Sequence, residues 1–237
     1  MTTYERIISI FATPLGYLIS VLYDLIANYG ITLIVFTILV RTLMLPLYAS
    51  QIKSSLRMQE MQPKMQEIQK KYANDREMLG IKMSEFYKTE KFNPMGGCMP
   101  MLVQMPILFA LFALLRNPLA FMGETMLMAV HESFLWTPDL SQPDPWILPF
   151  LCGIFTFISL SLTQMLSSSS GPAGSTAGMM KMMRYFFPVM IVWMARTFPS
   201  GLALYWFIGS VFQIGQTLVL RKKRAAKSEK EKNTKKK

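Results

Sequence analysis

The sequence has very few of the side chains that bind metals or act as nucleophiles. It contains one histidine, His131, and two cysteines, Cys98 and Cys152, among 237 residues. Metal centres and His-assisted hydrolytic sites need several such groups at ligand or hydrogen-bond spacing, and His131 has no such cluster around it. Glycine-rich phosphate-binding motifs are missing as well. We therefore expect no metal, no cofactor and no enzymatic activity.

Charge is scarce outside two segments. Only 16% of the residues are charged, and most of them lie in 51–93 and 221–237. The rest of the chain carries long apolar runs, and a bilayer core about 30 Å thick requires about 20 such residues per helix. These runs predict an all-α membrane protein with five transmembrane helices: Ile31–Tyr48, Met99–Leu115, Trp146–Leu162, Tyr185–Phe198 and Leu202–Leu220. The fourth run is short, so we expect residues 179–184 to extend it, with Lys181 and Arg184 reaching the headgroups.

Lysine and arginine are absent from 117–145, whereas 53–91 and the tail from Arg221 are rich in them. Positive loops stay in the cytoplasm, so the amino terminus is expected outside and the carboxyl terminus inside. On this topology the two cysteines lie near opposite membrane faces, too far apart for a disulfide.

The segment 7–27 is ambiguous. Its apolar residues gather on one helical face while Ser20 and Asp24 lie on the other, which favours an interfacial helix over a sixth span. The predicted division of the chain is an interfacial amphipathic helix at 1–28, transmembrane helix 1 at 29–50, a cytoplasmic helical hairpin at 51–94, transmembrane helices 2 to 5 at 95–220 with an outer loop at 117–145 and a cytoplasmic loop at 165–180, and a basic cytoplasmic tail at 221–237.

The hairpin carries apolar stripes at helical spacing, one around Met65 and one containing Met78 and Ile81, with Asn74 and Asp75 as turn and cap. Methionine side chains can bind varied apolar partners, but the favoured interpretation is that these stripes form the hairpin's own core. The low-complexity stretch at 167–178 is expected to be a flexible loop.

Arg41 lies near the middle of the first apolar run. An arginine at the bilayer centre costs at least about 2.5 kcal/mol, and no other predicted span offers a carboxylate to pair with it. We expect Arg41 to face a hydrated notch that attracts the acidic or polar flank of a passing peptide; the alternative is that it caps carbonyls or fixes helix packing. The polar side chains available to line this notch are Gln104, Gln164, Tyr205, Trp206, Ser210, Gln213 and Gln216.

The basic tail at 221–237 can contact either the phosphates of ribosomal RNA or anionic lipids, and its charge slightly favours a lipid anchor.

Three stretches carry a family resemblance. They are ATPLGYLISVLYDLIANYGITLIVFTILVRTLMLPL at 12–47, NPMGGCMPMLVQMPILFALFALL at 93–115 and FPSGLALYWFIGSVFQIGQ at 198–216. Together they resemble the YidC/Oxa/Alb family of membrane protein insertases, in its compact bacterial form without a large outer domain. The resemblance implies an insertase and chaperone of the bacterial plasma membrane, with a hydrophilic groove open to cytoplasm and lipid.

The resemblance places the groove arginine at Arg41 and its aromatic position at Trp206 or Tyr205, with looser matches at Gln104 and Gln164. Family members often have asparagine where Gly209 and Ser210 stand here. The implied partners are nascent membrane proteins, the Sec translocon, and the ribosome through the hairpin and tail. Two other classes stay open: a small solute transporter or channel with Arg41 as an anion site, and a purely structural assembly factor.

Overall fold

The structure is a computed structural model that describes residues 3–90, 99–167 and 175–234. Within these ranges the regular structure is helical, apart from one isolated bridge between Phe134 and Thr137, so the predicted all-α class is confirmed. The helices are α1 Thr3–Ile26, α2 Tyr29–Leu43, α3 Leu45–Lys71, α4 Arg76–Thr89, α5 Met99–Arg116, α6 Pro118–Phe121, α7 Thr125–Ala129, α8 Ile147–Ser167, α9 Ser175–Ala195 and α10 Ser200–Thr234.

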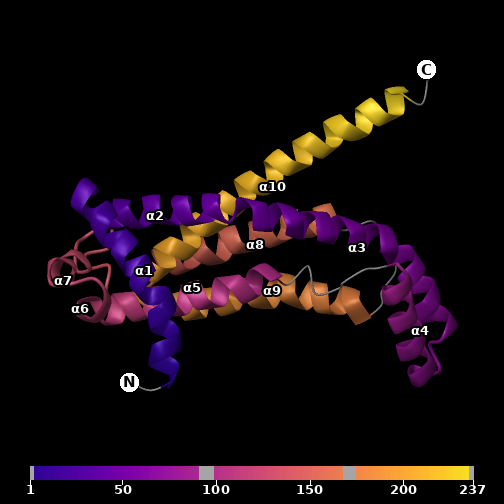
Figure 1. Ribbon diagram of the computed structural model, residues 1–237, viewed down its shortest axis with the longest axis horizontal. Helices are drawn as coiled ribbons and strands as arrows, with labels where there is room; N and C mark the ends of the chain where they lie inside the picture. Colours follow the sequence, from indigo (N-terminus) through magenta and orange to yellow (C-terminus); the bar gives the residue numbers. More distant parts are fainter. Residues whose placement is uncertain (1–2, 91–98, 168–174, 235–237) are drawn as a thin grey trace.

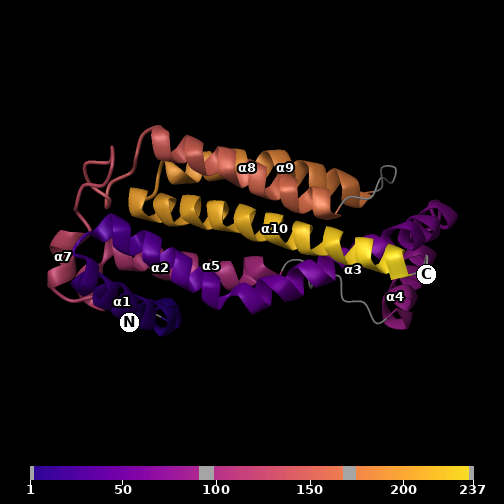
Figure 2. The same ribbon diagram turned by 90° about the horizontal axis from the view of Figure 1, so that it is seen from above.

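A bundle of lengthwise helices forms the body of the protein (Figure 1). Figure 2 shows α10 between α8 and α9 on one side and α2 and α5 on the other. The contacts agree, because α10 packs against α8, α2 and α5. Helix α10 is therefore the central element, and side chains on its different faces meet different neighbours.

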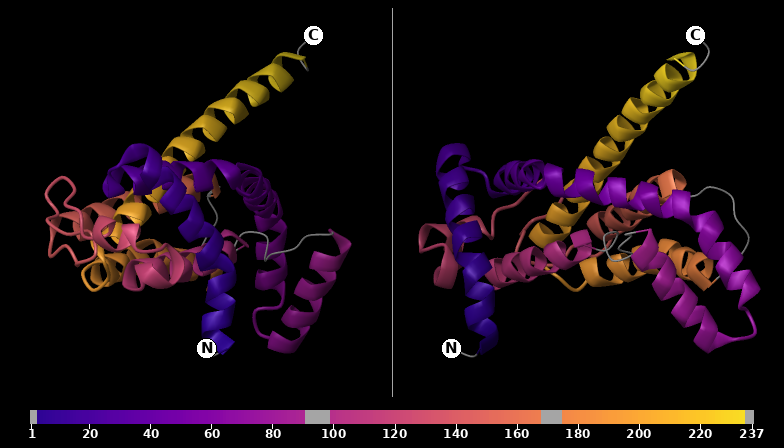
Figure 3. Two further views of the ribbon diagram at one scale, coloured as in Figure 1. Left: turned by 60° about the vertical axis from the view of Figure 1, so that its left-hand side comes forward. Right: turned by 45° about the vertical axis from the view of Figure 1, so that its right-hand side comes forward.

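Helix α1 runs across the bundle rather than along it, at the end where α6 and α7 lie (Figure 1 and Figure 3). It stops because Ala27 adopts the left-handed conformation (φ 54°), after which the Asn28 side chain accepts a hydrogen bond from the Ile31 amide and caps α2. This junction turns the chain from α1 into the bundle.

By length and apolarity, two segments of the described chain can cross a membrane, Ile8–Ile26 and Ser200–Val219. Shorter apolar helical segments lie at Tyr29–Leu43, Gln104–Arg116, Ile147–Thr163 and Arg184–Ala195. Helix α1 is long enough to span a membrane. It runs, however, in a different direction from the other apolar helices (Figure 1). The interfacial placement of α1 and the number of spans stay predictions.

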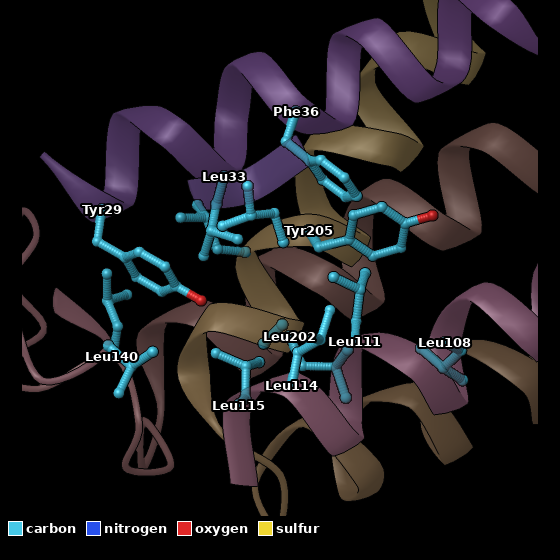
Figure 4. Packing of buried hydrophobic residues seen from close by; sticks show 14 of the residues in the cluster. Tyr29, Leu33, Phe36, Leu108, Leu111, Leu114, Leu115, Leu140, Leu202 and Tyr205 are labelled. Carbon is cyan, nitrogen blue, oxygen red and sulfur yellow. The ribbon is translucent and has the colours of Figure 1, made fainter. Parts of the chain in front are cut away.

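The apolar core joins α2, α5 and α10 (Figure 4). Leu33 and Phe36 of α2 face Leu111 of α5 and Tyr205 of α10, and all four are almost fully buried. In a bilayer such packing holds helices together through close contact rather than through exclusion of water. Val40, the residue before Arg41, also belongs to this core, so the core packs α2 against α10 right up to that arginine.

The hairpin is formed by α3 and α4. The helix break that precedes it falls at Met44, and α3 runs without interruption from Leu45 through residue 50 into the hairpin. The predicted cap is confirmed, because the Asp75 side chain accepts a hydrogen bond of 3.0 Å from the Met78 amide. Lys64 on α3 forms an ion pair of 2.6 Å with Glu90 just past the end of α4.

Three expectations about local structure need revision. Met65 is buried, but Met78 and Ile81 are exposed, so the second apolar stripe is not a hairpin core. The stretch 167–178 is not all loop, since α8 includes Ser167 and α9 begins at Ser175; residues 168–174 lie outside the described part. The expected extension of the fourth apolar run is present in α9, yet Arg184 donates to Ser161 Oγ of α8 at 3.0 Å, an interaction within the bundle.

Candidate functional site

Arg41 is buried near the end of α2, with 7% of its surface exposed. Its Nη1 donates a hydrogen bond to the Tyr48 hydroxyl on α3, and its guanidinium carbon lies 5.6 Å from the centre of that ring. None of the ion pairs among the described residues includes Arg41, and its buried Nε has no hydrogen-bond partner within them. The charge is therefore neutralised by no carboxylate in the described chain, as the sequence predicted.

Tyr48 is a site residue that the sequence interpretation missed. It follows Arg41 by seven residues, which is close to two helical turns, so the two side chains share one face. The spacing was available as a signal, but the search for a partner considered only the other predicted spans. The partner belongs to the same apolar run, just beyond the break at Met44.

Helix α10 approaches the guanidinium closely at Gly209. A Cβ atom added there would lie 2.4 Å from Arg41 Nη2 and 3.1 Å from Nε. The absence of a side chain at this position makes the room that Arg41 occupies. The family resemblance marked Gly209 only as a position near which relatives often have asparagine, whereas in the structure the missing side chain makes room for the Arg41 guanidinium.

Gln104 and Tyr205 meet across the bundle. The Gln104 side-chain amide of α5 donates to the Tyr205 hydroxyl of α10 at 2.8 Å. The Tyr205 ring also lies 6.5 Å from the ring of Phe36 on α2 (Figure 4). Two of the predicted site residues are thus brought together, at the border between the apolar core and the polar interior.

A second polar group joins α8 to α10. Trp206 Nε1 donates to Thr156 Oγ1 at 3.1 Å, and the hydroxyls of Thr156 and Ser210 lie 3.4 Å apart. Thr156 was not predicted. Serine and threonine in apolar helices commonly bond to their own backbone, as Ser210 also does to the Trp206 carbonyl, so their presence alone gives little signal.

For the remaining predicted residues the structure shows fewer interactions. Gln164 lies in α8, and its side chain is outside the described part; Gln213 lies half-buried in α10. Gln216 Nε2 and Ser159 Oγ are buried without a hydrogen-bond partner among the described residues. Buried polar groups therefore continue along α8 beyond Thr156 and along α10 beyond Ser210.

The cysteines and the possible metal ligands of the described residues form no second site of their own. Cys152 is a buried free thiol that donates to the Ala203 carbonyl at 3.2 Å, and Cys98 lies outside the described residues. In residues 3–90, 99–167 and 175–234, no three His, Cys, Asp or Glu side chains are grouped so that they could hold a metal. The expectation that the protein uses no metal or cofactor stays a prediction.

Comparison with known proteins decides the family. A family model described as "60Kd inner membrane protein" matches residues 21–228. A protein of Fusobacterium nucleatum named "Membrane protein insertase YidC" is 41% identical over 212 residues, which are 89% of this chain and 95% of that protein. The chain belongs to the YidC family. The resemblance drawn from its three sequence stretches is confirmed.

Other YidC proteins match over similar parts of the chain. The Oceanobacillus iheyensis protein of the same name is 41% identical over 225 residues, covering 92% of this chain and 85% of that one. A solved structure described as "Active YidC insertase crystal structure with the first transmembrane domain resolved" is 29% identical, with a TM-score of 0.65. The match covers 92% of this chain and 47% of the solved one, so the chain spans about half the length of that protein.

Proposed function

We propose that this chain is a membrane protein insertase that passes hydrophobic segments into the bilayer through the polar site around Arg41. The family supports the activity, because the relatives that match over most of their length are named insertases. The observation that carries the site is a buried guanidinium with no carboxylate partner in the described chain. The comparisons do not favour the solute transporter or channel.

The mechanism follows from the electrostatics of the bundle. An uncompensated cation in a region of low polarity attracts an anionic or strongly polar group, and the attraction is stronger there than in water. An acidic flank that arrives beside Arg41 would be stabilised partway across the membrane, and the neighbouring hydroxyls and amides of Tyr48, Gln104 and Thr156 would replace part of its water. No energy source enters this step.

The proposed topology has five spans, formed by α2, α5, α8, α9 and the first part of α10, in the inner membrane to which the family belongs. Helix α1 would lie at the outer interface, which its direction across the bundle supports. The absence of Lys and Arg from 117–145 supports an outer location for that segment, and the basic residues of 53–91 and 221–237 support a cytoplasmic hairpin and tail.

The hairpin and tail would supply the contacts with partners. Met78 and Ile81 are exposed on α4 and could receive nascent apolar segments. Basic residues continue along α10 to Thr234, where they could contact anionic lipids or a ribosome, with the Sec translocon beside the bundle.

Substitution of Arg41 tests the site. We expect Arg41→Ala to reduce insertion of a client with an acidic outer flank, and Arg41→Lys to retain part of the activity because it keeps the charge. Protease protection of the client in reconstituted vesicles measures insertion, and a client with a neutral flank is the internal control. Arg196→Ala is the matched control variant, since Arg196 lies beyond the end of α9 against the Trp146 ring. Undiminished insertion by Arg41→Ala would show that the site around Arg41 plays no part in insertion.

Two further measurements separate the insertase from its alternatives. A photoreactive group at Gln104 or Trp206 should crosslink to many ribosome-bound chains, whereas a transporter would bind one solute. In a variant with Cys98 and Cys152 replaced by serine, Arg41→Cys should react with an aqueous thiol reagent added from the inner face. Failure to react would show that no hydrated notch reaches this position.

A further inference from the structure

A second feature of the molecule lies far from Arg41. An open cavity of about 520 Å³ is present where α5 ends, bounded by the segment that contains α6 and α7 and by the turn between α9 and α10. Arg116, at its rim, follows Gln104 by twelve residues, which places it about 18 Å farther along α5 at 1.5 Å per residue. The cavity is thus a separate site.

The lining of this cavity holds one fixed positive charge, that of Arg116. Its lining includes Arg116 and His131 and contains no carboxylate. His131 Nδ1 is already bonded to Asp139 Oδ2 at 3.0 Å and lies 2.9 Å from Ser141 Oγ. Arg116 is exposed, lies 5.0 Å from the centre of the Phe112 ring, and has no ion-pair partner among the described residues. One cation at the rim is therefore available to an anionic ligand.

An arginine in the last turn of a helix is often explained by the helix dipole. Arg116 occupies that position in α5. The dipole accounts for the residue but not for the cavity beside it, nor for the uncharged polar side chains of Ser141, Gln142 and Thr197 that share the lining. Their combination with a free cation is typical of a binding site in which a few polar groups orient a small ligand.

We infer the depth of the cavity in the membrane from two exposed tryptophans of the segment between α5 and α8, which supplies part of the lining. Trp136 and Trp146 are exposed in the same outer segment, and Arg196 lies 4.2 Å from the centre of the Trp146 ring. Exposed tryptophans mark the membrane interface, where phospholipid headgroups lie. This placement rests on the topology in the proposed function, which puts 117–145 outside.

We propose that this cavity binds the headgroup of a phospholipid with net negative charge. Arg116 would contact the phosphate, Gln142 and Thr197 would hydrogen-bond the rest of the headgroup, and Phe112 and Leu127 would contact the glycerol and the start of the acyl chains. The lining has no carboxylate for a choline or ethanolamine cation, so zwitterionic lipids bind less well. The walls of the cavity are the ends of packed helices, which suits a lipid that stays bound. The flank of a client protein would have to leave the site once insertion is complete.

Lipid retention by the full-length protein tests the proposal. The protein is purified in detergent with equal amounts of phosphatidylglycerol and phosphatidylcholine, and native mass spectrometry counts the lipids that stay bound. We expect one phosphatidylglycerol to be retained with a preference of about tenfold, because phosphatidylcholine carries the same phosphate but adds a choline cation, which Arg116 repels and no carboxylate of the lining attracts. Arg116→Gln should abolish the preference, Arg116→Lys should keep part of it, and Arg196→Gln should leave it unchanged.

A second variant guards against misfolding of Arg116→Gln. Leu127→Trp keeps the charge but fills part of the cavity, and it should also lose the bound lipid. Equal retention of both lipids by the unchanged protein, or an undiminished preference in both variants, would overturn the proposal. Displacement of the lipid by inorganic phosphate or by an acidic client peptide would overturn the assignment to lipid. Insertion is measured in parallel: lipid binding without insertion would refute the proposed function and leave this site standing.

Discussion

Arg41 and Gly209 lie so close together that the position on α10 has room for no side chain: a Cβ on Gly209 would stand 2.4 Å from Arg41 Nη2. The guanidinium therefore rests against the backbone of the central helix. Because Tyr205 precedes Gly209 by four residues, about one helical turn, this contact places the cation on the face of α10 that also carries Tyr205 and its hydrogen bond from Gln104. The position of Arg41 depends on the absence of a side chain one helix away.

Gly209→Ala should impair the site without unfolding the protein. The atom in the way is the end of a flexible side chain, so the guanidinium will move rather than the helix, at about 0.5–1.5 kcal/mol for an off-rotamer side chain. We expect insertion of an acidic-flanked client to fall by about twofold to tenfold. Gly215→Ala is the matched control, because nothing lies within 4 Å of a Cβ there. Equal activity of the two variants in the vesicle assay would contradict the prediction.

Tyr48→Phe should destabilise the protein through Arg41. The substitution removes the hydroxyl that accepts the Nη1 hydrogen bond and leaves a buried donor on a charged group without a partner, a loss of about 1.5–3 kcal/mol. A double-mutant cycle with Arg41→Ala, measured by thermal unfolding in detergent, isolates the interaction. We expect Tyr48→Phe to lower the unfolding midpoint in the unchanged protein and to have little effect in Arg41→Ala. Additive effects would show that the two residues are not coupled.

Much of the fold could be predicted because membrane helices are encoded in runs of apolar residues and in the placement of charge. For α1 the amphipathic pattern favoured an interfacial helix but left a sixth span open, because the direction of α1 also depends on the left-handed backbone at Ala27 and on packing against α5. The helical continuation of α10 to Thr234 was also missed. The tail was interpreted from its charge alone, although alanine, lysine and glutamate are strong helix formers.

Some residues of the candidate site were predicted from the sequence and others were missed, for a physical reason. Gln104, Tyr205 and Trp206 stand out because amides and amphipathic aromatics are uncommon inside apolar runs, and the structure gives each a polar partner. Thr156 does not stand out, since its hydroxyl can bond to its own helix. Gly209 has no chemistry of its own, and its contribution becomes visible only when the neighbouring helix is in place.

Glu132→Ala should loosen α1 from the rest of the protein. The Glu132 carboxylate accepts one hydrogen bond from the Tyr23 hydroxyl of α1 and another, of 2.7 Å, from the Tyr29 amide at the start of α2. Two charge-assisted bonds of this kind stabilise the junction by roughly 1.5–3 kcal/mol each. We expect faster amide exchange along α1, measured by mass spectrometry, while exchange in α8 stays unchanged.

Glu124→Ala provides the comparison for that experiment. Glu124 precedes α7, is exposed, and makes no side-chain capping hydrogen bond. Its loss should leave exchange in α1 as it is, because the residue makes none of the contacts that join α1 to the outer segment. If both variants accelerate exchange equally, general loosening of the outer segment, rather than the bonds made by Glu132, accounts for the effect.

Asp139 should make the outer segment sensitive to acid. Burial raises the pKa of this carboxyl, but hydrogen bonds from His131 and Ser141 outweigh it, so the pKa lies below its ordinary value of 3.8. An acid with a depressed pKa stabilises the folded state fully above its unfolded pKa, about 3.9, and loses that contribution as pH falls through the folded value. The difference in unfolding midpoint between the unchanged protein and Asp139→Asn should therefore be constant from pH 6 to about pH 5 and shrink on acidification toward pH 3. Glu124→Gln should show no such convergence, and a difference for Asp139→Asn that persists at pH 3 would show that the carboxylate charge does not stabilise the segment.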